Sequence, residues 1–182
     1  MNINQETLYA VALTRINHFN VATSLQLYRK LGSATTIMEH RHDIRAVLPD
    51  ATPRLIEAFK DISDAMRRAE KELEFDESHR IKPLVFNDDE YPQRLRECED
   101  APLVLYYRGT ADLNKQRIIS VVGTRHCTVY GQEIISKFIS QLKELCPDTL
   151  VVSGLAYGVD IHAHRNALKN GLETVGVLDH GL

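Results

Sequence analysis

The chain has 182 residues, of which 43% are hydrophobic, enough to bury the core of one domain or of two small ones. Lys and Arg number 22 against 25 Asp and Glu, so the net charge of -3 excludes a globally basic protein and limits any nucleic-acid contact to a local patch. Three cysteines without CxxC spacing, no signal segment and no long apolar run predict a soluble cytoplasmic protein with no disulfide framework, metal site or membrane contact.

The first segment, residues 1–75, is predicted to be a small all-α domain. Apolar residues recur at three- and four-residue steps over residues 6–16 and 21–31, and Gly32 is placed to end the second helix. The longest helix is expected over residues 53–75, after Pro53. The spacing resembles a pair of helix-hairpin-helix units, also found in SAM-like domains.

The two hairpins of this segment read INHFN and LPDATP. Both lack the glycines that let backbone amides approach a phosphate closely. A structural or partner-docking role for the segment is therefore favoured over direct DNA binding, with Phe19 in the core and His18 in solvent.

The second segment, residues 76–182, alternates strands and helices. Entry or edge strands are predicted at residues 83–86 and 103–107. Three further strands, at residues 118–122, 149–152 and 174–178, alternate with helices at residues 130–145 and 159–169. This order predicts an α/β, Rossmann-like parallel sheet with helices on both faces, in which ligands bind at the carboxyl ends of the strands.

Small and polar residues follow each of the last three strands, at residues 123–125, 153–158 and 179–181. No GxGxxG or GxxxxGK[ST] motif is present, which disfavours a dinucleotide or ATP site. Arg125 directly follows Gly123 and Thr124, so a planar cation stands beside backbone amides and a hydroxyl. That combination suits a phosphate oxygen.

The strand-to-helix corner over residues 151–168 is predicted to form the second wall of this site. Ser153 and Gly154 close the strand, and Gly158 is expected to adopt a positive φ that leaves backbone amides open to an anion. Tyr157 is the aromatic residue of the corner and is a candidate for stacking on a base.

Asp160, His162 and His164 do not have the spacing of a metal site. On a helix, Asp160 shares a face with His164, whereas His162 points about 200° away. Asp160 is therefore predicted to cap the helix or to hold His164 in place, and neither a metal nor a cofactor is expected.

The motifs VVGTRHCTVYG, VVSGLAYGVDIHAHRNAL and TVGVLDHGL, preceded by YPQRLRECEDAPLVLYYRG, resemble the DNA-processing protein DprA (Smf) family over residues 88–182. The resemblance implies a Rossmann-like core that binds and protects single-stranded DNA and helps to load the RecA recombinase in natural transformation. It implies no catalytic step, so the protein is not expected to be an enzyme.

The family's phosphate-binding GTR falls on Gly123, Thr124 and Arg125, and its SGLAxGxDxxAH motif starts at Ser153 and ends at His164. His162 stands where the family usually has a small residue, which favours a polar contact at the rim of the site. The candidate DNA-binding residues are Gly123, Thr124, Arg125, Ser153, Gly154, Tyr157, Gly158, Asp160 and His164.

The family continues beyond the third strand, so the resemblance implies a truncated chain whose homodimer contacts lie downstream of Leu182. Two alternatives remain open. One is a Rossmann-type nucleotide hydrolase of the lysine-decarboxylase-like group, although the PGGxGTxxE motif is missing. The other is a protein-docking module built on the N-terminal helices.

Overall fold

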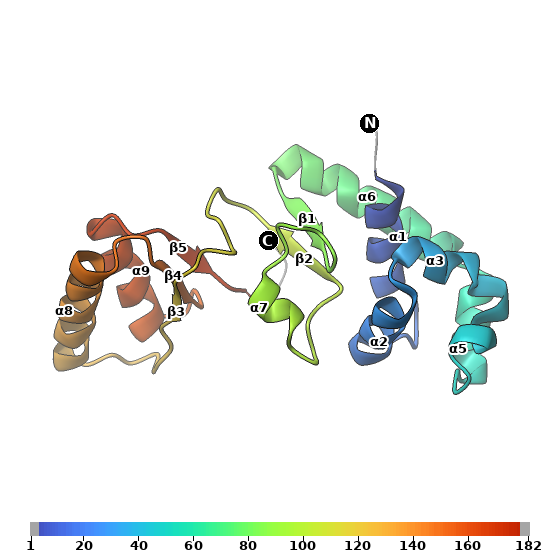
Figure 1. The fold of residues 1–182 in the computed structure, drawn as a ribbon, viewed down its shortest axis with the longest axis horizontal. Coiled ribbons are helices and arrows are strands. Elements are labelled where there is room, and N and C mark those ends of the chain that lie inside the picture. The colour runs from blue at the N-terminus through green and yellow to red at the C-terminus, as the bar shows by residue number, and fades with distance from the viewer. Residues whose placement is uncertain (1–3, 179–182) are drawn as a thin grey trace. The chain divides into compact units, whose positions relative to one another are not determined.

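The computed structural model describes residues 4–178, which divide into two compact units. The first unit ends at Arg108 and the second begins at Gly109. Figure 1 shows that the first unit is mainly helical and carries a two-stranded antiparallel sheet, and that the second is built on a three-stranded parallel sheet. The predicted α/β class with a helical N-terminal part is therefore confirmed.

Local sequence explains where the helices of the first unit begin. An Asn, Ser or Thr side chain before α1, α2, α3 and α5 accepts a hydrogen bond from a backbone amide of the first turn, as N-cap residues do. The helices are α1 (Gln5–Thr14), α2 (Val21–Leu31), α3 (Ala34–Glu39), the 3₁₀ helix η1 (Arg41–Asp43), α4 (Ile44–Val47), α5 (Pro53–Lys60), α6 (Ser63–His79) and α7 (Gln93–Arg96).

The first hairpin joins α1 to α2 and is held by its aromatic residue. Phe19 is buried, and its ring meets the Phe59 ring edge to face with 5.2 Å between centroids, while His18 is exposed with φ of 64°. Gly32 ends α2 in the left-handed region, with φ of 84°. These placements agree with the sequence-based predictions for Phe19, His18 and Gly32.

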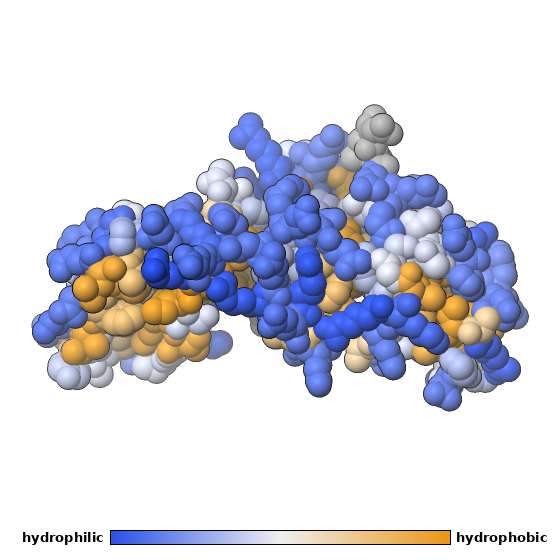
Figure 2. All heavy atoms as spheres, in the orientation of Figure 1, coloured by the Kyte–Doolittle hydropathy of each residue, from blue (hydrophilic) through white to orange (hydrophobic). Residues whose placement is uncertain are grey.

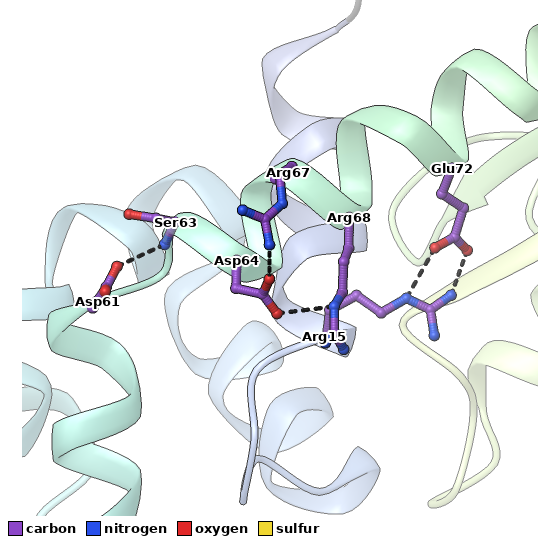
Figure 3. Close-up of polar contacts among 7 residues, drawn as sticks. All are labelled: Arg15, Asp61, Ser63, Asp64, Arg67, Arg68 and Glu72. Carbon is purple, nitrogen blue, oxygen red and sulfur yellow. Dashed lines mark hydrogen bonds and ion pairs between the residues drawn. The ribbon is translucent and has the colours of Figure 1, made fainter.

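The long helix predicted over residues 53–75 is instead two helices, α5 and α6. Asp61 is extended, with φ of -122° and ψ of 98°, and its side chain accepts a hydrogen bond from the Ser63 amide at 3.0 Å (Figure 3). A short acidic side chain that bonds the backbone two residues ahead offers the chain an alternative to continued helix. The Asp61 side chain therefore ends the helix at a position where the apolar periodicity predicts that it continues.

A hairpin of β1 (Lys82–Val85) and β2 (Val104–Tyr107) packs with the helices of the first unit. Leu84 and Val85 are buried, and β1 contacts α1 and α6. The domain boundary predicted after residue 75 lies inside α6, and the compact units divide at Arg108. The later division arises because the hairpin buries its apolar residues against helices that precede it in the chain.

A polar cluster joins α1, α6 and β2. Arg15 donates from Nε to Glu72 Oε2 at 2.9 Å and makes a second bond to the same carboxylate (Figure 3). Asp76 lies one turn further along α6 and is only 4% exposed, and its Oδ2 has no hydrogen-bond partner within residues 4–178. Burial, reinforced by the Glu72 charge, raises the pKa of Asp76 to about 6. Burial also raises the pKa of the Tyr106 phenol.

Asp76→Asn is expected to raise the free energy of unfolding at pH 7 by about 1–2 kcal/mol, because it removes a buried charge that lacks a full set of partners. The folded-state pKa of Asp76 lies above its unfolded value, so the cost is absent below about pH 4 and complete above about pH 6. Urea denaturation at pH 4 and pH 7 measures the difference. A variant that is equally or less stable than the wild type at pH 7 would contradict this account.

The second unit is a parallel sheet with strand order β3-β4-β5. Its strands are β3 (Ile118–Ser120), β4 (Leu150–Ser153) and β5 (Thr174–Gly176), and its helices are α8 (Val129–Leu145) and α9 (Val159–Lys169). The alternation and the bounds of α9 match those predicted from the sequence. A sheet of this kind places the carboxyl ends of all three strands at one edge.

Both α8 and α9 pack on the same face of this sheet, in place of the predicted helices on both faces. Ile135 and Ile139 of α8 share one core cluster with Ala163 and Ala167 of α9 and with Val151 of β4. The physical reason is topological. Strand order advances by one position in the same direction at each step, so two right-handed crossovers must lie on the same side.

Figure 2 shows hydrophobic side chains gathered on the surface over α8, at the left of the view. The large exposed hydrophobic residues of this helix are Val129, Tyr130, Ile134, Phe138 and Leu145. α8 therefore has a second apolar face besides the one in the core. Even so, every helix between residues 4 and 178 is too short or too polar to cross a membrane.

Candidate functional site

The ends of β3 and β4 meet at the start of α9. The Val159 amide, in the first turn of α9, donates a hydrogen bond to the Thr124 carbonyl oxygen at 3.1 Å. Thr124 Oγ1 in turn accepts from the His126 amide at 3.2 Å, which shapes the loop that carries Arg125. The structure thus brings the loop of residues 123–125 against the corner of residues 153–158, as expected for parallel strand ends.

This close approach requires glycine at two positions. A Cβ on Gly158 would lie 2.1 Å from the Thr124 carbonyl oxygen, and Gly158 has the predicted positive φ, of 85°. A Cβ on Gly123 would lie 2.6 Å from a methyl group of Val159. The two glycines therefore let two loops that are distant in sequence touch through their backbones.

A pocket of about 770 Å³ opens where the two loops meet. The start of α8 lines one side, where Thr128 caps the helix by accepting from the Gly131 amide at 3.1 Å. The start of α9 lines the other side, and there Gly158 is the N-cap residue and no side chain caps the helix. Amide groups at helix N-termini favour anions, so the pocket has backbone groups of positive character on two sides.

The charged side chains around the pocket are cationic. Arg125 and Arg165 line it together with His126 and His162, and none of the pocket's described lining residues is acidic. Within residues 4–178, neither guanidinium has a hydrogen-bond or ion-pair partner, and both side chains are exposed. In a chain of net charge -3, this is a local concentration of unpaired positive charge.

Apolar groups line the rest of the pocket. Leu155, Tyr157 and Ile161 contribute side chains, and Tyr157 is 84% exposed. An aromatic ring standing free in solvent next to unpaired cations offers a surface on which a planar base can stack. The pocket thus combines unpaired cations with an exposed aromatic ring.

Several of the sequence-predicted residues lie beneath the pocket. Ser153 is buried and donates from Oγ to the Val121 carbonyl oxygen at 2.6 Å. His164 is buried, with Nδ1 2.7 Å from Thr174 Oγ1 and Nε2 2.6 Å from the Gly154 carbonyl oxygen. These contacts tie β4, α9 and β5 together, so Ser153 and His164 support the site rather than line it.

Asp160 takes neither of the roles predicted for it. It lies in the first turn of α9 and does not cap the helix, and His164 bonds to Thr174 and Gly154 instead. Its side chain is buried with Oδ1 unpartnered among the described residues, and a Cβ on Gly154 would lie 2.7 Å from Oδ2. Asp160 therefore fills the space that Gly154 leaves free.

The third predicted strand end, at residues 179–181, lies outside the described residues. Val177, two residues before this segment, still lies alongside β4, because its amide donates to the Ser153 carbonyl oxygen at 2.8 Å. Within residues 4–178, no group of His, Cys, Asp and Glu residues has the geometry to hold a metal ion.

Several lining residues were not predicted from the sequence, namely His126, Cys127, Thr128, Ile161 and Arg165. A signal for two of them was present, because Gly158, Ile161 and Arg165 recur at three- and four-residue steps on one face of α9. His126 and Thr128 lie one and three residues after Arg125, and only the folded loop shows that they line the same pocket as the start of α9.

Comparison with known proteins agrees with this architecture. Residues 82–182 match the family described as DNA recombination-mediator protein A. The chain belongs to this family. The matched residues include the whole pocket lining.

Among curated proteins, the chain is similar to the DNA processing protein DprA of Streptococcus pneumoniae, to which it is 43% identical over 95 residues, covering 52% of this chain and 33% of that protein. DprA of Bacillus subtilis is 35% identical over 103 residues, covering 56% of this chain and 34% of that protein. The X-ray structure of S. pneumoniae DprA superposes with a TM-score of 0.73 at 28% identity, over 94% of this chain and 57% of that one.

The chain thus spans about a third of these curated relatives in sequence. The structural match is wider than the sequence matches, because it covers 94% of this chain. The helical first unit is therefore also part of the likeness to the solved family member.

Proposed function

We propose that this protein binds single-stranded DNA, without sequence preference, at the pocket between the β3 loop and the start of α9. The main observation in support is the set of unpaired cations around this pocket. Arg125 and Arg165 line it, and no acidic residue is present in its described lining. Phosphates are the anions that such a set of guanidinium groups and amides suits best.

A single strand fits the pocket better than a duplex does. Tyr157 and Leu155 expose apolar surface beside the cations, and a base can reach this surface only when it is not stacked within a double helix. Backbone amides and arginines that contact phosphates read no base edges, so binding is independent of sequence.

The names of the relatives support this proposal. The S. pneumoniae and B. subtilis proteins are both called DNA processing protein DprA. We extend the proposal: the protein protects incoming single strands, helps to load RecA in natural transformation and self-associates. Surface plasmon resonance with purified RecA tests this wider role separately, and absence of binding counts against it.

Arg125→Gln is expected to weaken binding of oligo-dT by about 10- to 100-fold, which is about 1.5–3 kcal/mol for a lost charged hydrogen bond. The slope of log affinity against log salt concentration should also become shallower by about 0.7, the value for one phosphate contact on a single strand. Fluorescence anisotropy at several salt concentrations measures both quantities.

Lys137→Gln is the matched control, because Lys137 is an exposed cation of α8 outside the pocket. It removes one positive charge and should leave affinity and slope as in the wild type. Equal behaviour of the Arg125 and Lys137 variants would argue against the proposed site.

The protein is proposed to act by binding alone, so release of free base from a nucleoside monophosphate would favour the nucleotide-hydrolase alternative.

A further inference from the structure

One exposed face of α9 carries only positive or polar groups. His162, Arg165 and Lys169 succeed one another at three- and four-residue steps, so they lie along one stripe of the helix. The acidic residue of α9 is Asp160, which is buried on the other side with Ala163 and Ala167. The stripe is therefore a row in which the cations Arg165 and Lys169 follow His162 without an intervening carboxylate.

Several other surface cations of the chain are neutralised by a neighbouring carboxylate. Lys60, Arg67, Arg68, Lys82 and Lys115 each pair with a carboxylate. Arg165 and Lys169 have no such partner within residues 4–178. Neutralised surface charges are ordinary for a solvated helix, whereas an unneutralised row keeps its attraction for an anionic chain.

The row is continuous with the pocket. His162 and Arg165 line the pocket, and Lys169 lies one helical turn beyond Arg165, about 6 Å further along the axis. From Arg125 the cations thus lead across the pocket to Arg165 and then along the surface of α9 to Lys169.

We propose that this face of α9 is a track that carries the DNA strand out of the pocket, with Arg165 and Lys169 contacting successive phosphates beyond the one held by Arg125. The inference rests on the proposed function and deepens it, because it gives the strand a direction and the site a length. Arg165 belongs to both the pocket and the track, whereas Lys169 belongs to the track alone.

Lys169→Gln therefore separates the track from the pocket. Its affinity for a thymidine dinucleotide, which fills only the pocket, should equal that of the wild type. Its affinity for an oligo-dT of about ten nucleotides should fall several-fold, and the salt slope for that oligomer should decrease by about 0.7. Arg165→Gln should weaken binding of both ligands, and Lys137→Gln should weaken neither.

Fluorescence anisotropy and isothermal titration calorimetry on the whole chain give these affinities, and circular dichroism checks that each variant is folded. If Lys169→Gln binds the longer oligomer as the wild type does while Arg125→Gln is impaired, the track is overturned and the pocket stands. If the wild type binds neither ligand, the proposed function falls and the track falls with it.

Discussion

Gly158→Ala should abolish measurable oligo-dT binding and lower the free energy of unfolding of the second unit by about 3 kcal/mol or more. Two costs act together at this residue. Its φ of 85° is unfavourable for any residue with a Cβ, and the new methyl group would lie 2.1 Å from the Thr124 carbonyl oxygen. Because the neighbour is backbone, relief requires that the two loops separate, which breaks the bond from the Val159 amide to Thr124.

Gly171→Ala is the control for the first cost alone. Gly171 also has a positive φ, of 69°, but a Cβ there meets no atom within 4 Å. This variant should lose only about 1 kcal/mol and should bind oligo-dT normally. Amide hydrogen exchange in β3, β4 and α9 measures the local stability. If the two variants are equally stable, the contact between the loops does not hold the site together.

Glu6→Gln should produce the second large effect, a loss of about 2–3 kcal/mol of stability in the first unit. The Glu6 carboxylate accepts hydrogen bonds from the Ala34 amide at 2.6 Å, the Thr35 amide at 2.9 Å, the Thr35 hydroxyl at 2.7 Å and the Tyr28 hydroxyl at 2.9 Å. These bonds join α1 to α2 and α3. A glutamine keeps one oxygen and turns an amide group toward donors that then lack an acceptor.

The same carboxylate makes stability depend on pH. Burial opposes ionisation of Glu6, but the hydrogen bonds from Thr35, Ala34 and Tyr28 outweigh it, so the pKa of Glu6 lies below its ordinary value. Its contribution is therefore complete at neutral pH and is lost as the pH falls through the folded-state pKa. Asp76, whose pKa is raised, has the opposite effect: it lowers stability as the pH rises.

Denaturation of the wild type and of Glu6→Gln between pH 3 and pH 7 checks both statements, since the difference between them should shrink in acid. Glu57→Gln is the control, because Glu57 pairs with Lys60 at 2.7 Å on an exposed surface. That pair should contribute no more than about 0.5 kcal/mol. A Glu6 variant as stable as the Glu57 variant would contradict the role given to these hydrogen bonds.

Features that depend on neighbours in the chain were predictable from the sequence. The bounds of α2 and α9, the left-handed Gly32 and the positive φ of Gly158 follow from periodicity, capping residues and glycine placement. The break at Asp61 is also local, but it depends on one side chain bonding its own backbone, and periodicity carries no sign of that competition.

Features that depend on packing were decided only by the tertiary structure. The sequence by itself determined that Arg125 and the glycine corner lie at one edge of a parallel sheet, because alternating strands and helices predict parallel strands whose carboxyl ends share an edge. It did not determine that Ser153 and His164 face inward while His126 and Arg165 face the pocket, since strand and helix rotation are set by how the apolar faces pack. The site therefore forms where the Thr124 carbonyl meets the Val159 amide, a contact between residues 35 positions apart in the chain.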